Sequence, residues 1–284
     1  KELRTIERGE RTLKVAVITA PGSHQDVQAQ NAGDKEFRST TRDVRRLLDE
    51  AKADKVDGVV LDLRGNGGGY LPEATALTGL FVEKGPVVQL KVTTGELEVQ
   101  DDPDPTIAYA GPLAVLVDRF SASASEIFAG AIQDYRRGVV LGQRTFGKGT
   151  VQNLVPLDRW SAKPTSGQLT VTIGKFYRVT GESTQHRGVE PDVPLPSPID
   201  IEEVGESALP GALPWDRIPG VPFRLESRMP KTPIATLALE ERARADQDPN
   251  YRWLVSDLAA LDTIRKQTSL SLNLKERQAE RIRL

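Results

Sequence analysis

Strand-like and helix-like segments alternate along the chain from residue 13 to about residue 195. A helix is expected after Ser39 and Thr40, because the apolar residues behind them recur every three to four positions, and the continuous apolar run 59–63 predicts a buried strand. Further helices are expected from Pro72 and after Ser121. The other strand patterns occupy residues 13–19, 87–92, 113–117, 139–141, 151–157 and 169–176. This alternation predicts an α/β layered domain rather than a helical bundle or a β-sandwich.

The pattern changes after Asp192, where prolines crowd together and a Pro/Gly-rich stretch extends over residues 205–222. Beyond it, residues 236–248 and 251–266 show helical periodicity, and residues 274–284 form a charged, helix-compatible tail. We therefore expect a core over residues 13–198, followed by a linker and a helical appendage over residues 199–284. The charged residues 1–12 are expected to be the remnant of a linker from an upstream region.

Composition removes several classes of chemistry. The 38 basic and 40 acidic residues give a formal charge of −2, which disfavours nucleic acid as a partner. With no cysteine and two histidines, the chain excludes a cysteine nucleophile and a Cys/His metal site, and we expect no metal and no cofactor. No apolar run approaches the length of a membrane span, so the chain is not expected to cross a membrane.

The segment 121–127, Ser-Ala-Ser-Ala-Ser-Glu-Ile, stands between the strand 113–117 and the next helix. A serine at this turn would lie at the positive end of the helix dipole, and the next backbone N–H could contribute to an oxyanion hole. Ser123 and Glu126 also match a capping box, so a purely structural role is the alternative.

The segment 142–150 is close to a phosphate-binding P-loop, but Gly149 occupies the position of the required serine or threonine. The residues that follow it predict a strand, whereas a P-loop opens a helix. A nucleotide site is therefore disfavoured. The same glycines can instead hold Lys148 on a tight loop, and a solvated turn residue is the other interpretation.

The segment 62–69, Asp-Leu-Arg-Gly-Asn-Gly-Gly-Gly, directly follows a predicted buried strand. Its three consecutive glycines permit positive φ and expose backbone N–H groups, as an oxyanion hole requires, although a simple turn has the same composition. Asp62 is expected to pair with Arg64. The two histidines, His24 and His186, are interpreted as surface residues, so a lysine is the expected base for an activated serine.

In this order, the motifs at 62–69, 121–126 and 145–152 strongly resemble those of the carboxyl-terminal processing proteases, which are Ser/Lys endopeptidases. The likeness is greatest to the bacterial tail-specific members, whose motifs also match residues 39–44 and 176–185. The resemblance implies a crotonase-like core, an acyl-enzyme mechanism and a periplasmic location. It also implies protein or peptide substrates with unstructured or apolar C-termini, and an adaptor protein as a possible partner.

The resemblance places the nucleophile at Ser123, the general base at Lys148 and an orienting glutamine at Gln152. It places the oxyanion donors at Gly68 or Gly69 together with Ala124. A lysine with an ordinary pKa of about 10.4 is a poor base at neutrality, so the assignment requires an environment that favours the neutral amine. No PDZ peptide-binding loop is recognisable in the sequence. A catalytically silent scaffold of the same fold and a P-loop nucleotide hydrolase are the alternatives.

Overall fold

A computed structural model describes residues 1–102, 106–158, 167–226 and 234–283. Its larger sheet has six strands in the order β1-β2-β3-β6-β7-β10, and every neighbouring pair is parallel except β1 with β2. The strands are β1 (Glu2–Arg8), β2 (Arg11–Thr19), β3 (Gly58–Asp62), β6 (Leu113–Val117), β7 (Val139–Gly142) and β10 (Val193–Pro194). The predicted α/β layering is confirmed.

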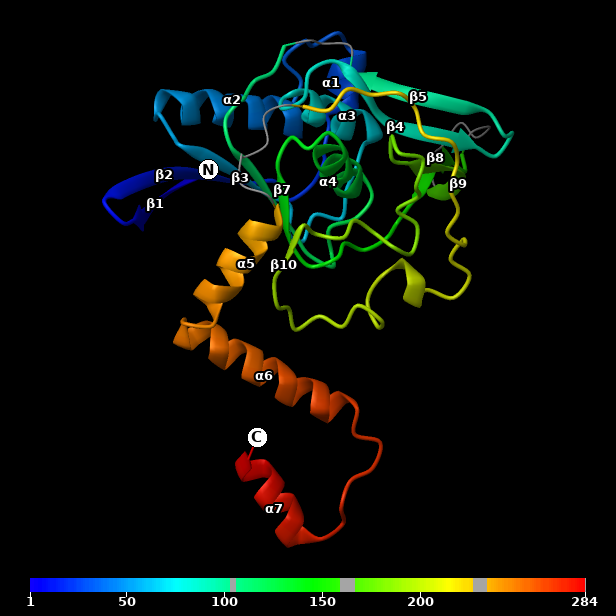
Figure 1. The fold of residues 1–284 in the computed structure, drawn as a ribbon. Helices are drawn as coiled ribbons and strands as arrows, with labels where there is room; N and C mark the ends of the chain where they lie inside the picture. Colours follow the sequence, from blue (N-terminus) through cyan, green and yellow to red (C-terminus); the bar gives the residue numbers. More distant parts are fainter. Residues whose placement is uncertain (103–105, 159–166, 227–233, 284) are drawn as a thin grey trace.

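Three helices, α2 (Thr40–Ala53), α3 (Leu71–Gly79) and α4 (Ala124–Asp134), gather beside this sheet (Figure 1). The central strands β2, β3 and β6 each bury one face against these helices. Ile18, Leu61 and Val115 of the strands lie in one buried cluster with Leu48 of α2 and Phe128 of α4. The most buried positions alternate along β3 and β6, and the continuous apolar runs to which they belong are why the sequence pattern identified these strands correctly.

The smaller sheet has four antiparallel strands in the order β5-β4-β9-β8. They are β4 (Gly85–Val92), β5 (Leu97–Asp102), β8 (Thr150–Pro156) and β9 (Gln168–Tyr177). β8 is an edge strand that pairs only with β9 among the strands described. It begins directly after the Gly-Lys-Gly motif, so the position of that motif is linked to this second sheet.

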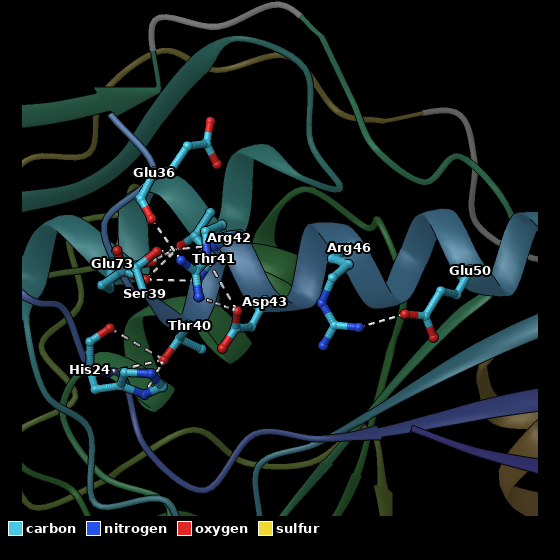
Figure 2. Close-up of polar contacts among 10 residues, drawn as sticks. All are labelled: His24, Glu36, Ser39, Thr40, Thr41, Arg42, Asp43, Arg46, Glu50 and Glu73. Carbon is cyan, nitrogen blue, oxygen red and sulfur yellow. Dashed lines mark hydrogen bonds and ion pairs between the residues drawn. The ribbon is translucent and has the colours of Figure 1, made fainter. Parts of the chain in front are cut away.

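Helix α2 is fixed at its beginning by polar contacts (Figure 2). The Ser39 side chain caps the helix by accepting a hydrogen bond from the backbone N–H of Arg42, as the sequence predicted. Thr41 donates from its backbone N–H and its hydroxyl to the buried carboxylate of Glu73 in α3, both at 2.8 Å. The Thr40 hydroxyl donates to the carbonyl of Gly22, at 2.7 Å, which ties α2 to the loop before it.

The structure differs from the expectations at the N-terminus and in several short elements. The first residues, expected to be a linker, form β1, which pairs with β2 along its whole length. The short elements α1 (Val27–Asn31) and η1 (Glu206–Ala208) and the strand β5 were not foreseen. The limits proposed for the core and for the C-terminal region stay predictions.

The C-terminal region has two parts with different packing. Residues 199–226 run along the core, whereas α5 (Ile234–Ala245), α6 (Pro249–Arg265) and α7 (Leu274–Arg283) extend away from it (Figure 1). Within the described ranges, no helix combines the length and apolarity needed to cross a membrane.

Candidate active site

Three neighbouring parallel strands bring the three sequence motifs to one edge of the large sheet. The glycine motif follows β3, the serine motif follows β6 and the lysine motif follows β7. Because the carboxyl ends of parallel strands meet at the same edge, these loops must lie together. Hydrogen bonds join the first two: Ala122 N–H donates to the Asn66 carbonyl at 3.0 Å, and the Ser121 hydroxyl donates to the Leu63 carbonyl at 2.8 Å.

Ser123 differs from the serines on either side of it. Ser121 and Ser125 are fully buried, and their hydroxyls donate to backbone carbonyls of the glycine loop. Ser123 is half-buried and stands at the N-terminus of α4 with a φ of 57°, a region that serine rarely adopts. Backbone strain of this kind is concentrated at functional sites, where it sets the direction of a reactive side chain.

The glycine loop lies directly against Ser123. A Cβ atom placed on Gly68, which has a φ of +95°, would be 2.8 Å from the Ser123 Cβ and 2.9 Å from the Ala124 nitrogen. Only glycine permits both this φ and this approach. The neighbouring Gly69 packs on Ser23, whose N–H donates to the Gly68 carbonyl at 2.9 Å. Ser23 lies between Gly22 and His24, both of which the Thr40 side chain contacts, so the beginning of α2 supports the glycine loop through Ser23 (the contact with His24 is drawn in Figure 2).

The backbone amides of this region are not equivalent. The Gly68 N–H donates to the Asn66 Oδ1 at 2.9 Å and is therefore occupied. In the part of the chain that the structure describes, the N–H groups of Gly69 and Ala124 have no hydrogen-bond acceptor. Of the two glycines that the family resemblance offered as oxyanion donors, Gly69 thus has the available amide, while Gly68 supplies the close packing.

Lys148 and Gln152 are brought together as predicted. The Lys148 Nζ donates to the Gln152 Oε1 at 3.1 Å. The four-residue spacing between them does not run along one regular strand, because β8 begins only at Thr150 and its pairing with β9 is irregular at Val151 and Gln152. Among the described residues, no hydrogen bond joins the Lys148 amine to the Ser123 hydroxyl; catalytic hydrogen bonds are often completed only when substrate binds.

Glu126 connects the serine and lysine motifs. Its Oε2 accepts the backbone N–H groups of Ser123, at 2.7 Å, and of Lys148, at 3.0 Å, so the two backbone nitrogens lie at most 5.7 Å apart, the sum of these distances. Its Oε1 accepts from the Thr145 hydroxyl at 2.6 Å and from the Gly147 N–H at 2.7 Å. Burial raises the pKa of this fully enclosed carboxyl to about 7, while the four donors oppose the rise.

These contacts exclude the P-loop interpretation. The N–H groups of Gly147 and Lys148 are taken by Glu126, and the motif continues into strand β8 instead of a helix. No row of free amides at a helix N-terminus is present at residues 142–150 to receive a phosphate.

The two histidines have different surroundings. His24 is exposed, as expected, and its Nδ1 lies 2.9 Å from the Thr40 Oγ1 (Figure 2). His186 is half-buried, contrary to expectation, because it packs on the lysine loop and donates its backbone N–H to the Gly147 carbonyl. The expected pairing of Arg64 with Asp62 is confirmed, at 2.8 Å.

Some residues that hold this site were not recognised from the sequence. Glu126 was recognised only as a capping residue, although its carboxylate reaches beyond its own helix. Asn66, which is buried, was read as part of a turn. Gln185 and Arg119, both fully buried, gave no signal except their position within or beside the motifs. Each acts through hydrogen bonds to residues distant in the sequence, and a local pattern does not encode such contacts.

A strained, half-buried serine, a lysine whose backbone N–H is bound by the same Glu126 carboxylate, and two backbone amides without an acceptor among the described residues thus lie together at this edge of the sheet. Consistent with this site, residues 15–195 match the model of peptidase family S41, and residues 199–284 match that of the C-terminal domain of tail specific protease. The chain belongs to peptidase family S41.

Individual relatives agree with this membership. The chain is 45% identical to the tail-specific protease of Haemophilus influenzae, over 84% of this chain and 35% of that protein. It is 36% identical to the chloroplastic C-terminal processing peptidase of Tetradesmus obliquus, over 58% of this chain and 35% of the relative. The solved photosystem II D1 C-terminal processing protease is 30% identical, with a TM-score of 0.54, over 67% of this chain and 44% of that one. The chain thus spans about a third of the length of these curated relatives.

Proposed function

We propose that the chain is the catalytic part of a serine endopeptidase that works through a Ser123–Lys148 dyad. The observation that carries this proposal is the single Glu126 oxygen that binds the backbone N–H groups of both residues, because it keeps the nucleophile and the base side by side. The strained φ of Ser123 supports the same assignment. The core that carries the dyad is proposed to be crotonase-like.

The reaction proceeds through an acyl-enzyme. The neutral Lys148 amine accepts the Ser123 hydroxyl proton as the Ser123 oxygen bonds to the scissile carbonyl carbon. The N–H groups of Gly69 and Ala124 stabilise the oxyanion that forms. The carbon–nitrogen bond then breaks, and the leaving amine takes the proton from Lys148. Water, deprotonated by Lys148, attacks the ester, and Ser123 regains its proton as the product acid departs.

Gln152 orients the lysine in this scheme. Its neutral carbonyl oxygen accepts from the Lys148 amine without adding a negative charge, which would favour the protonated lysine. Since Gln152 exchanges no proton, its removal should weaken catalysis without abolishing it.

The names of the relatives support the proposed substrates. They describe tail-specific and C-terminal processing proteases, so we infer that this protein cleaves proteins selected through their C-terminal tails. Unstructured or apolar tails are the proposed preference, which follows from the resemblance of the sequence motifs. An adaptor protein is a proposed partner, and the periplasm is the proposed compartment.

The deciding experiment compares the chain with its Ser123→Ala variant on an unstructured protein substrate. We expect the variant to fold like the parent and to cleave nothing, because the other two serines of the motif are already bonded to the glycine loop. Ser125→Ala is the matched control and should retain cleavage. Equal rates for the parent and Ser123→Ala would refute the nucleophile. A folded parent that neither cleaves nor reacts with a serine-directed covalent probe would instead favour a silent scaffold.

A further inference from the structure

We propose that the first part of the C-terminal region positions the loop that carries the catalytic lysine. We call residues 201–218 the strap and residues 143–149 the base loop. The strap lies in the segment that matches the C-terminal domain of tail specific protease, whereas the base loop lies in the peptidase segment. The proposal rests on the catalytic role proposed above for Lys148, and it gives the strap a function within the active site.

The main link is the side-chain amide of Gln185, which is fully buried. Its Oε1 accepts the N–H of Gly149, directly after Lys148, at 2.8 Å. Its Nε2 donates to two acceptors of the strap, the Glu206 Oε1 at 3.1 Å and the Leu213 carbonyl at 2.9 Å. One amide therefore spans from the strap to the end of the base loop, with both of its ends hydrogen-bonded.

A second link passes through Arg119, a fully buried residue of the turn before Ser123. Its guanidinium donates to the Thr145 carbonyl of the base loop and to the Val204 carbonyl of the strap. It also donates to the Ile201 carbonyl at 2.8 Å. A Cβ on Gly205 would lie only 2.0 Å from the Arg119 Nη2, so the strap passes as close to the guanidinium as a glycine permits.

The backbones of the two segments also meet directly, because the Glu206 N–H donates to the Phe146 carbonyl at 3.0 Å. The base loop contains no helix or strand, so its shape depends on such contacts. Glu126 holds it on the side of the nucleophile, and the strap and Gln185 hold it on the other side. A catalytic group needs its position fixed to within a fraction of an ångström, and one loop held from both sides satisfies that requirement.

Exchanging the two side chains of the main link tests the proposal. Gln185→Glu puts a carboxylate against the Glu206 carboxylate, and it removes the donor to Glu206 and Leu213. Glu206→Gln alone keeps an oxygen that can accept from Gln185. The double variant restores one hydrogen bond between these positions with its direction reversed.

We expect Gln185→Glu to lower kcat about tenfold or more while KM changes less than about twofold, because Lys148 is displaced but the substrate contacts remain. Glu206→Gln should stay near the parent, and the double variant should recover most of the lost kcat. The Gly149 amide should exchange faster with solvent in Gln185→Glu and return towards the parental rate in the double variant. A folded Gln185→Glu with parental kcat and parental exchange would overturn the proposal, as would a double variant no better than Gln185→Glu.

Should Gln185→Glu not fold, Glu206→Ala decides, since it leaves the bonds from Gln185 to Gly149 and Leu213 in place. A reduced kcat at constant KM is then expected, and a parental kcat would overturn the proposal. Amide exchange at Gly149 requires no turnover, so it tests the link even if Lys148 proves not to be the base. Failure of the proposed function and failure of this inference are thereby distinguishable.

Asp216→Asn is the matched control within the strap. Its side chain accepts from the Lys175 amine at 2.8 Å and from the Tyr177 hydroxyl at 3.0 Å, and both partners lie on β9 rather than on the base loop. This variant should lose stability with kcat and Gly149 exchange unchanged. A fall in kcat equal to that of Gln185→Glu would mean that the strap acts only through general stability, and the positioning role would be refuted.

Discussion

Replacing Glu126 with glutamine should change the pH dependence of stability. The carboxylate is fully buried, and burial raises its pKa from 4.5 to about 7 against the effect of four hydrogen bonds. The folded protein therefore holds this proton more tightly than the unfolded chain does. Stability from this group is complete below pH 4.5 and is lost as the pH rises through about 7.

The magnitude follows from the rise in pKa from 4.5 to about 7. At about 1.4 kcal/mol for each pKa unit, the parent should lose about 3 kcal/mol from this residue between pH 4 and pH 8. Glutamine does not ionise, so its contribution to stability does not change between pH 4 and pH 8. Its amide must, however, direct an NH₂ group at two N–H or O–H donors, which removes hydrogen bonds worth about 1.5–3 kcal/mol each.

The assay is urea unfolding of both proteins at several pH values from 5 to 8. We expect Glu126→Gln to be the less stable protein at pH 5, with the difference in the free energy of unfolding narrowing by about 2.5 kcal/mol by pH 8. The variant should cleave poorly at every pH, since its amide cannot accept from Ser123 and Lys148 and also from Thr145 and Gly147. A stability difference that is independent of pH would show that the four donors outweigh burial, and the reasoning from desolvation would be refuted.

Three further predictions concern the chemistry of the site. Lys148→Arg should reduce cleavage by at least about 100-fold, because a guanidinium accepts no proton, whereas Gln152→Ala should retain a measurable rate; a lysine on a merely structural turn would tolerate arginine. Gly68→Ala should reduce kcat about 100-fold or more, because its Cβ would press on the Ser123 Cβ from 2.8 Å; a parental rate would show that the loops can separate without consequence. Amidating the C-terminus of a substrate should change its rate of cleavage little if recognition of the tail resides outside this chain, and a large loss would place that recognition within it.

Much of the core could be predicted from the sequence because its signals are local. The continuous apolar runs of β3 and β6 are typical of central strands covered on both faces, and Ser39 caps α2 as its residue type predicts. The position of the site then follows from the topology, because the loops after neighbouring parallel strands lie at the same edge of the sheet. β1 was missed because its residues are exposed and charged, so its pairing with β2 leaves no apolar pattern.

The contacts that hold the site could not be predicted from local sequence patterns, because they join residues that are distant in the sequence. Glu126 and Thr145 lie 19 positions apart, and Gln185 and Gly149 lie 36 positions apart. Buried polar residues resemble surface residues in composition, and only the fold shows that their partners are other loops. The strap was read as a linker because of its prolines and glycines, yet Gly205 is required there for contact with Arg119.

Different packing of the two parts of the C-terminal region predicts opposite results for two truncations. Among the described residues, α6 has no buried residue, and the only buried residue of α5 is Ala245. A chain ending at Glu226 should therefore fold and keep the reactivity of Ser123. It should lose a modest amount of stability, because Leu237 of α5 lines an apolar hollow on the open face of the large sheet. A chain ending at Asp200 should not fold stably, since it removes acceptors from the buried guanidinium of Arg119.

Thermal unfolding and labelling by a serine-directed probe would compare the two truncated chains. If the chain ending at Asp200 melts like the parent, the strap adds nothing to the core. If the chain ending at Glu226 fails to fold, the outlying helices contribute more than their exposed surfaces indicate. If the chain ending at Glu226 folds and the chain ending at Asp200 does not, the smallest stable catalytic unit includes the strap. Its boundary then differs from that of the two family models, which meet between residues 195 and 199.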